Sequence, residues 1–185
     1  MAYSLEQFYK DCRLSLTIDP DGRGQEAVRG YLEELLTHRE AVFEALGPKP
    51  EPGRCLLHHD DETDMYVYAH VYAKEGGNKA HDHGPCWIIY GNLTGHTDMV
   101  EWRRTDDGSA AGQASLEKLK EYRVRAGEAV LFKTGSIHET RHPSGDSILI
   151  RVISGDMDRV WRHNFDPERG IVRDRPPRPE REAVG

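Results

Sequence analysis

A mainly β protein, with short strands in a sandwich or barrel behind a helical N-terminal segment, is the fold class that the sequence predicts. Two observations carry this prediction. Between Leu5 and Leu46 apolar residues recur three and four positions apart, which is the period of a helix with one buried face. After the segment 47–53, which is rich in proline and glycine, short apolar runs separated by Gly, Asp and Asn clusters replace that period.

The N-terminal segment, residues 1–50, is expected to form two or three amphipathic helices packed on the barrel. One helical face collects the first apolar residues of the chain, Leu5, Phe8, Tyr9 and Cys12. A second apolar face runs through residues 28–43. The Pro-Asp-Gly sequence at 20–22 predicts a turn between the two.

The barrel is expected to occupy residues 51–170. Its clearest strand is Met65–Tyr72, where small apolar residues alternate with aromatic residues and histidine, as in a strand covered on both faces. Further short runs predict strands at 86–90, 97–102, 122–124, 129–132 and 147–153. The polar segment 104–115 is expected to be an exposed hairpin loop, and residues 171–185, rich in proline and charge, a flexible tail.

Composition and charge narrow the range of functions. With 31% charged residues and a net charge of -7, the chain is expected to be a soluble, mildly acidic globular protein, and the lack of a basic stripe argues against a nucleic-acid partner. No apolar stretch is long enough to span a bilayer, and the N-terminal residues show no secretion-signal pattern, so a cytoplasmic location is expected. The cysteines Cys12, Cys55 and Cys86 form no closely spaced pair, which fits a reducing compartment.

Two histidines in the segment AHDHGPCWIIYGNLTG, residues 80–95, begin a candidate metal site. His81 and His83 are separated by one residue, so on an extended segment both rings point to the same side. Imidazole is the commonest neutral ligand of divalent transition metals, but two ligands alone do not make a site. A third histidine, His138, follows a glycine, a strand and a turn in the segment AGEAVLFKTGSIHETRH.

The two segments, in this order and with predicted strands between them, resemble the two motifs of the cupin barrel. The resemblance implies a cupin double-stranded β-helix, or jelly-roll, barrel with N-terminal helices, and a metal ion held by His81, His83 and His138. The alternative is a cupin barrel that has lost its metal and keeps these histidines as polar wall residues. Cupins usually carry a glutamate ligand four or five residues after the second histidine, where this chain has Trp87 and Ile88.

A site of three histidines without a carboxylate resembles that of the cysteine dioxygenase (thiol dioxygenase) family of cupins. The resemblance implies non-haem Fe(II), and it implies that Arg54 holds the substrate carboxylate through two parallel hydrogen bonds. The alternative for Arg54 is a solvated residue after the linker. This chain departs from the family downstream, where Arg151 and Ile153 stand in place of a His-x-Tyr pair. Cys86 is expected to be an ordinary buried thiol.

Other side chains are expected to replace the missing tyrosine and histidine. The candidate catalytic residues are Tyr68, His70 and Arg151. The candidate substrate-binding residues are Arg54, Tyr72 and Trp87. His70 is alternatively a satisfied core histidine, and the tyrosines are alternatively packing aromatics. A buried Arg151 would require a bound carboxylate or a partner such as Glu139.

The function expected from these residues is oxidation of a small, anionic thiol by dioxygen to a sulfinate, with Fe(II) as the cofactor. One alternative is another three-histidine cupin enzyme, such as a dicarbonyl-cleaving oxygenase, a lyase or an isomerase, with Zn, Ni or Mn as the metal. The other is a non-catalytic cupin that binds a small acid. A homodimer is also left open by the sequence.

Overall fold

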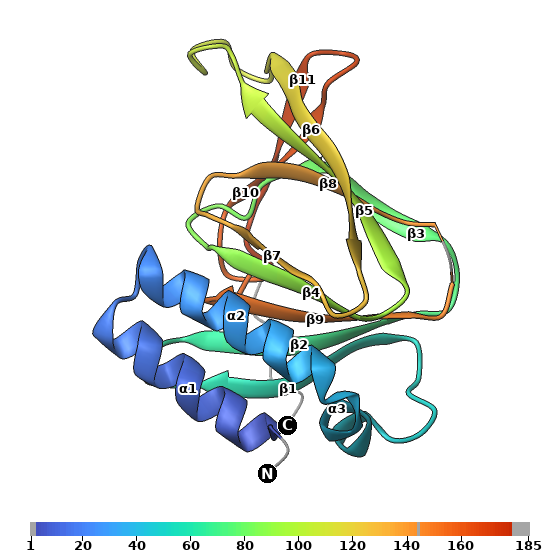
Figure 1. The fold of residues 1–185 in the computed structure, drawn as a ribbon. Coiled ribbons are helices and arrows are strands. Elements are labelled where there is room, and N and C mark those ends of the chain that lie inside the picture. Colours follow the sequence, from blue (N-terminus) through green and yellow to red (C-terminus); the bar gives the residue numbers. More distant parts are fainter. Residues whose placement is uncertain (1–2, 144, 179–185) are drawn as a thin grey trace, which may run out of the picture.

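The computed structural model describes residues 3–143 and 145–178, which form three helices and eleven strands (Figure 1). The helices are α1 (Leu5–Ile18), α2 (Arg23–Thr37) and α3 (Arg39–Leu46). The first strands are β1 (Gly53–Asp60), β2 (Met65–Tyr72), β3 (Gly76–His81), β4 (Ile88–Thr94), β5 (His96–Arg104) and β6 (Leu116–Arg125). The remaining strands are β7 (Ala129–Phe132), β8 (Ile137–His142), β9 (Ser147–Ser154), β10 (Arg162–Asp166) and β11 (Ile171–Arg175).

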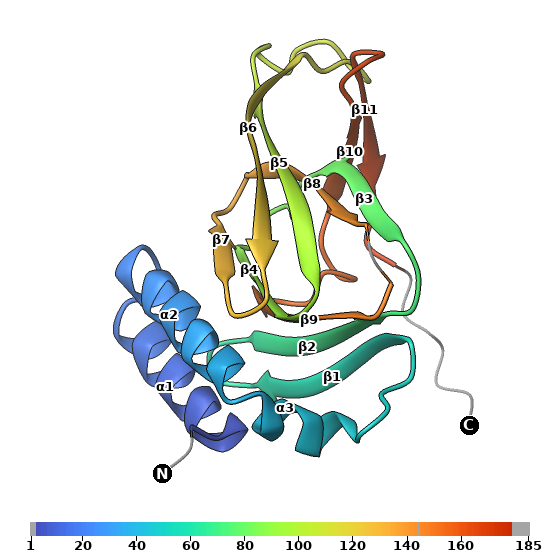
Figure 2. The same cartoon turned by 45° about the vertical axis from the view of Figure 1, so that its right-hand side comes forward.

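The strands form two antiparallel sheets that face each other and enclose a barrel (Figures 1 and 2). One sheet has the order β1-β2-β9-β4-β7 and the other the order β11-β10-β3-β8-β5-β6. From β2 to β10 the chain passes from one sheet to the other at nearly every connection, and only β5 and β6 form a hairpin within one sheet. This alternation is the winding of a double-stranded β-helix. The predicted fold class, a mainly β jelly-roll barrel with N-terminal helices, is confirmed.

The helices cover the outer face of the first sheet, as both views show (Figures 1 and 2). Ser4 caps α1 by accepting a hydrogen bond from the backbone N–H of Gln7 at 3.1 Å. The helices and the sheet share one apolar layer, whose buried helical members include Phe8, Cys12, Leu16, Val28, Leu32, Leu35 and Leu36. Glycine at position 91 of β4 lets α2 approach closely, because a Cβ there would lie 2.7 Å from Leu32 Cδ2. None of the described helices has the length and apolar character needed to cross a membrane.

Alternation along the strands of the first sheet separates the apolar core under the helices from the core of the barrel interior. In β2, Met65, Val67 and Ala69 face the helices, whereas Tyr66 and Tyr68 pack against the barrel interior. The interior core is formed by buried residues of several strands, among them Ile88, Tyr90, Met99, Phe132, Leu149 and Ile153. The predicted strand with both faces covered is therefore present, and its two faces serve different layers.

The C-terminal segment differs from its prediction. Residues 171–185 were expected to be a flexible tail, but Ile171–Arg175 form β11, which pairs with β10 along its whole length. The prediction of a flexible tail is therefore wrong for residues 171–175. The content of proline and charged residues does not reveal that another segment, β10, pairs with this one. Residues 176–178 follow without regular structure, and the rest of the predicted tail lies outside the described residues. The polar segment 104–115 connects β5 to β6, as expected for a hairpin loop.

Candidate metal centre

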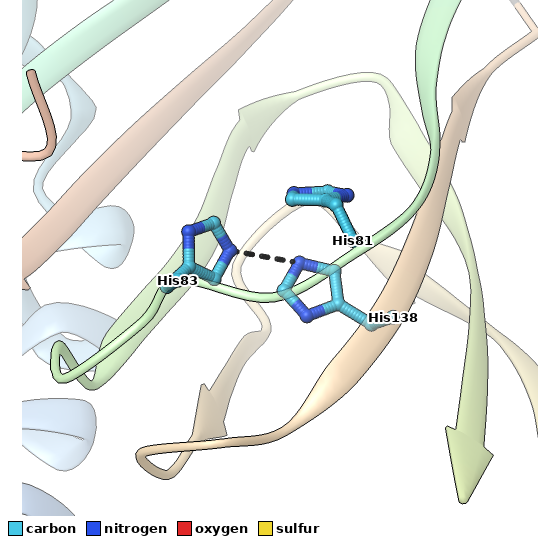
Figure 3. Close-up of side chains that lie close together, drawn as sticks. All are labelled: His81, His83 and His138. Carbon is cyan, nitrogen blue, oxygen red and sulfur yellow. Dashed lines mark hydrogen bonds between the residues drawn. The ribbon is translucent and has the colours of Figure 1, made fainter. Parts of the chain in front are cut away.

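Three histidines converge at the wall of the barrel from two neighbouring strands (Figure 3). His81 is the last residue of β3, His83 follows two residues later, and His138 lies on β8 directly opposite His81 in the antiparallel register. All three are buried, and their ligand atoms lie within 4.8 Å of one another. Within the described part of the chain, the structure thus contains a three-histidine metal-binding site.

The rings are oriented for a shared ion through their Nε2 atoms. His81 Nδ1 lies 2.8 Å from the carbonyl oxygen of Lys79, which only accepts, so Nδ1 carries the proton and Nε2 keeps its lone pair. His83 Nδ1 is occupied by Met157 Sδ at 3.0 Å, and the ring of His138 stacks on Phe132 with centroids 3.9 Å apart. His83 Nε2 and His138 Nε2 are 3.3 Å apart. Two nitrogens bound to one ion at about 2.0–2.1 Å, with an angle of about 90–109°, are separated by about 2.8–3.4 Å, so the pair fits a metal ion.

Burial keeps the three imidazoles neutral. It lowers the pKa of His81 to about 4, with the positive charge of Arg151 as a smaller cause and the Lys79 carbonyl opposing it. The pKa values of His83 and His138 lie well below the ordinary value, again chiefly through burial and then through the neighbouring His81. A neutral imidazole offers a lone pair without first releasing a proton, so the three side chains are in the form that a metal ion requires.

Asp82, between the two ligand histidines, does not belong to this group. Its Oδ2 is 2.7 Å from Nδ1 of His163, and its Oδ1 accepts hydrogen bonds from the backbone N–H groups of His163 and Gly84. These contacts pin the segment that carries His81 and His83 to β10. The only carboxylate within the histidine motif is thereby used to hold the loop in place.

Residues 87 and 88 point to opposite faces of the first sheet. Trp87 packs in the layer between helices and sheet, so its predicted role in substrate binding is wrong. Ile88 packs in the barrel interior together with Tyr90. An apolar side chain therefore occupies the inward-facing position at which the cupin pattern leads one to expect a carboxylate, and the reason is the side-chain alternation of a strand.

Tyr90 is a residue of the centre that the sequence reasoning missed. Its buried hydroxyl accepts a hydrogen bond from Arg151 Nη2 at 2.9 Å and lies 3.2 Å from His83 Nε2 and 3.4 Å from His138 Nε2. The signal that could have identified it is its spacing: two residues after Ile88 on one strand, it shares the inward face.

Arg151 links the metal centre to a pocket. It lies on β9 between Tyr68 of β2 and Tyr90 of β4, with its guanidinium carbon 5.0 Å from the centre of the Tyr90 ring. Among the described residues its Nε has no hydrogen-bond partner. The expected partner Glu139 is instead bonded to Arg141 at 2.9 Å, so that suggestion for Arg151 is wrong.

A pocket of about 270 Å³ adjoins the centre and contains several of the predicted residues. Arg54, His70, Tyr72 and Arg151 line it together with His81. Tyr68 lies beside this group, with the Arg54 guanidinium 4.9 Å from the centre of its ring. Burial, followed by the charge of Arg151, lowers the pKa of His70 to about 3. Three larger surface hollows, of about 420, 370 and 430 Å³, touch none of the three histidines.

Comparison with known proteins gives a likeness at the level of the fold. No protein-family model matches the sequence, and no curated protein matches it. KdgF from Halomonas sp. is similar in structure at 17% identity, covering 58% of this chain and 84% of that one, with a TM-score of 0.43. An uncharacterized protein with a double-stranded β-helix domain from Klebsiella pneumoniae is similar at 16% identity, covering 61% and 85%, with a TM-score of 0.39. The DMSP lyase DddQ from Ruegeria pomeroyi is similar at 15% identity, covering 56% and 46%, with a TM-score of 0.39. These likenesses assign no activity to the chain.

Proposed function

We propose that the chain is an Fe(II)-dependent cupin dioxygenase that converts a small anionic thiol into a sulfinate. The observation that carries the proposal is the convergence of three buried, neutral imidazoles, with no carboxylate among them, beside a cationic pocket. In the reaction the thiolate sulfur forms two bonds to oxygen while the O–O bond breaks, so RS⁻ and O₂ give RSO₂⁻. Sulfur loses the four electrons that dioxygen gains, and no further reductant is needed.

The ligand set suits this chemistry. Bound Fe(II) would supply open coordination positions for a thiolate and dioxygen, together with the electrons that activate dioxygen. Three neutral donors leave the full charge of the ion available to an anionic substrate. The hydrogen bond between His81 and the Lys79 carbonyl, and the packing of His138 on Phe132, hold the donor atoms in place.

The remaining residues bind and orient the substrate. Arg54 and Arg151 line the pocket beside His81, and a guanidinium binds a carboxylate through two parallel hydrogen bonds. Tyr90 accepts a hydrogen bond from Arg151, so its own O–H is available for donation to a substrate atom at the centre. His70 is neutral and has an unpartnered Nε2 among the described residues, so it contributes a hydrogen bond rather than a charge. Tyr72 also lines the pocket.

Oxygen consumption by anaerobically purified protein tests the proposal. The protein is loaded separately with Fe(II), Zn, Ni and Mn, and a panel of small thiols with and without a carboxylate is supplied. We expect thiol-dependent oxygen uptake with Fe(II) alone and one sulfinate, found by mass spectrometry, per dioxygen consumed. His83→Ala should abolish uptake. His59→Ala, which removes a half-buried histidine beside Asp61 and Asp64 and outside the metal centre, should not.

Other outcomes would assign the site differently. Turnover of an oxygen-rich substrate without oxygen uptake, with Zn, Ni or Mn, would point to a lyase or isomerase. Cleavage of a dicarbonyl with oxygen uptake would keep the dioxygenase class and change the substrate. Full loading with Fe(II) and no uptake with any thiol would overturn the proposal.

A further inference from the structure

We infer that the pocket beside the metal centre binds a small molecule with at least two anionic groups. This inference rests on the proposed function, because it names the substrate class of that same site. Six cationic side chains line the pocket, and they are Arg54, Lys79, Arg151, Arg162, Arg175 and Arg178. Asp158 is the one carboxylate among the lining residues, so positive charge is in large excess.

Asp158 does not neutralise these cations. Its carboxylate is shared by three guanidiniums, those of Arg54 and Arg178 at 3.4 Å and that of Arg162 at 3.9 Å. Among the described residues, neither Lys79 nor Arg151 nor Arg175 has a carboxylate within ion-pair distance. One negative charge is therefore divided among half of the cations, and the other half have none.

Two of the arginines carry a buried N–H donor for which the described part of the chain offers no acceptor. Arg162 is 5% exposed, and its Nε–H has no partner among the described residues; the same holds for Nε of Arg151. Burial and the nearby charge of Arg175 lower the pKa of Arg162, which is the response of a guanidinium held away from water and beside a like charge. A buried guanidinium N–H without an acceptor is unfavourable, and a ligand with anionic oxygens would supply the missing acceptors.

The distribution of the cations favours two anionic groups over one. Arg151 on β9 lies on the metal side of the pocket, bonded to Tyr90, whereas Arg54 belongs to β1 and Arg175 to β11. A single carboxylate occupies one guanidinium fork, or bridges two, and would leave the cations of the other wall unpaired. At about 270 Å³ the pocket is below the usual size of drug-binding pockets, so the ligand is compact.

The C-terminal segment builds one wall of this site. Arg175 ends β11, and Arg178 lies three residues beyond, with its backbone N–H bonded to the Asp158 carbonyl oxygen at 2.7 Å. The charges that looked like those of a solvated tail in the sequence are thus folded back beside His81 and Arg151.

Paired probes of equal length test the inference on the Fe(II)-loaded protein under anaerobic conditions. Isothermal titration calorimetry compares succinate with butyrate, which has the same number of carbons and one carboxylate fewer. We expect succinate to bind at least ten-fold more tightly, with an affinity that falls steeply as salt rises. Inorganic phosphate is the third probe: binding tighter than that of succinate would indicate a site for one doubly charged group and would overturn the inference, whereas weaker binding would support two separated anionic groups.

Matched arginine variants locate the binding. Arg175→Gln, at an exposed position, and Arg162→Gln should each weaken succinate binding at least ten-fold and butyrate binding less. Arg103→Gln, which removes an exposed arginine paired with Glu117 on the far hairpin, should change neither. Arg162 is buried, so Arg162→Gln can fail to fold. In that case the effect of Arg175→Gln on succinate binding is the test of the inference.

Equal affinities for succinate and butyrate, or succinate binding that survives Arg175→Gln, would overturn the inference. The measurement involves no turnover, so it is separate from the proposed activity. If the protein oxidises a monoanionic thiol but binds succinate and butyrate equally, only the inference of two anionic groups is refuted. Tight, arginine-dependent succinate binding without any thiol oxidation would refute only the activity.

Discussion

Replacing Tyr90 by phenylalanine removes one hydroxyl from the metal centre and leaves the aromatic ring in its core. The ring stays against Phe132, at a centroid distance of 5.9 Å, so little apolar burial changes. The change removes the acceptor for Arg151 Nη2, which lies 2.9 Å from the Tyr90 oxygen, and it also removes the hydroxyl that lies 3.2 Å from His83 Nε2. Arg151 already has an unpartnered Nε among the described residues, so this change deprives the guanidinium of a second partner.

The expected loss follows from the type of bond. A hydrogen bond with one charged partner contributes about 1.5–3 kcal/mol, so Tyr90→Phe should lower the free energy of unfolding by about 2 kcal/mol. For a chain of this size about 1 kcal/mol corresponds to about 2–4 °C, which predicts a fall in Tm of about 4–8 °C. The metal is removed with a chelator first, so that the stability change is not mixed with a change in metal affinity.

A double-mutant cycle with Arg151→Met checks the cause. Urea denaturation is measured for both single variants and for the pair, and the loss caused by Tyr90→Phe should shrink by at least about 1 kcal/mol once Arg151 is gone. The loss that remains comes from the contact between the Tyr90 hydroxyl and His83 Nε2. Tyr122→Phe is the matched control, because its hydroxyl donates to Glu101 in the other sheet and should show no coupling to Arg151. Additive losses for Tyr90 and Arg151 would refute the reasoning.

Three further predictions concern pH, packing and the metal. Because the folded pKa of His70, about 3, lies below its ordinary value of 6.5, stability should fall as pH drops from 6.5 toward 3, by about 1.4 kcal/mol per pH unit from this residue. Urea denaturation of His70→Gln between pH 6.5 and 4.5 should show a shallower slope by that amount, and an unchanged slope would contradict the assignment. Gly91→Ala places a Cβ 2.7 Å from Leu32 Cδ2 and 2.8 Å from Leu36 Cδ1, so it should cost about 1–3 kcal/mol by urea denaturation. Adding Leu32→Ala should then cost less than it does alone, and simple additivity would argue against the clash. A metal at 100 times its Kd adds about 2.7 kcal/mol, so a chelator should lower Tm by about 5–11 °C in the native protein and by little in His138→Ala. A chelator effect of equal size in both would place the metal elsewhere.

The three metal-binding histidines could be predicted from the sequence because the motifs that contain them are short and local. His81 and His83 are spaced for one side of an extended segment, and His138 follows a glycine, a strand and a turn in a recognisable order. What the sequence did not contain is the register that sets His138 opposite His81 across β3 and β8. That register depends on pairing between segments more than fifty residues apart, and a slip of one residue would turn the ring away.

The predicted role of Trp87 shows a second limit of the sequence, which concerns the two faces of the first sheet. Trp87 and Ile88 were both noted where a carboxylate is usual, but Trp87 directly precedes β4 and Ile88 is its first residue, so the two point to opposite faces and only one can face the metal. The structure assigns the interior to Ile88 and Tyr90 and the helix layer to Trp87. Without knowledge of which face the helices cover, the wrong one of two neighbours was chosen for substrate binding.

By itself, the sequence determined the helical N-terminal segment, the doubly covered strand Met65–Tyr72, and a ligand set of neutral imidazoles without a carboxylate. These depend on periodicity and on residue type, which are properties of short stretches. Only the tertiary structure decided that Tyr90 bonds Arg151 beside the histidines, and that arginines from β1, β9, β10 and β11 line one pocket. The reason is physical: a charge in an isolated segment is solvated, and it becomes part of a binding site only when strands distant in the chain bring like charges together around one pocket.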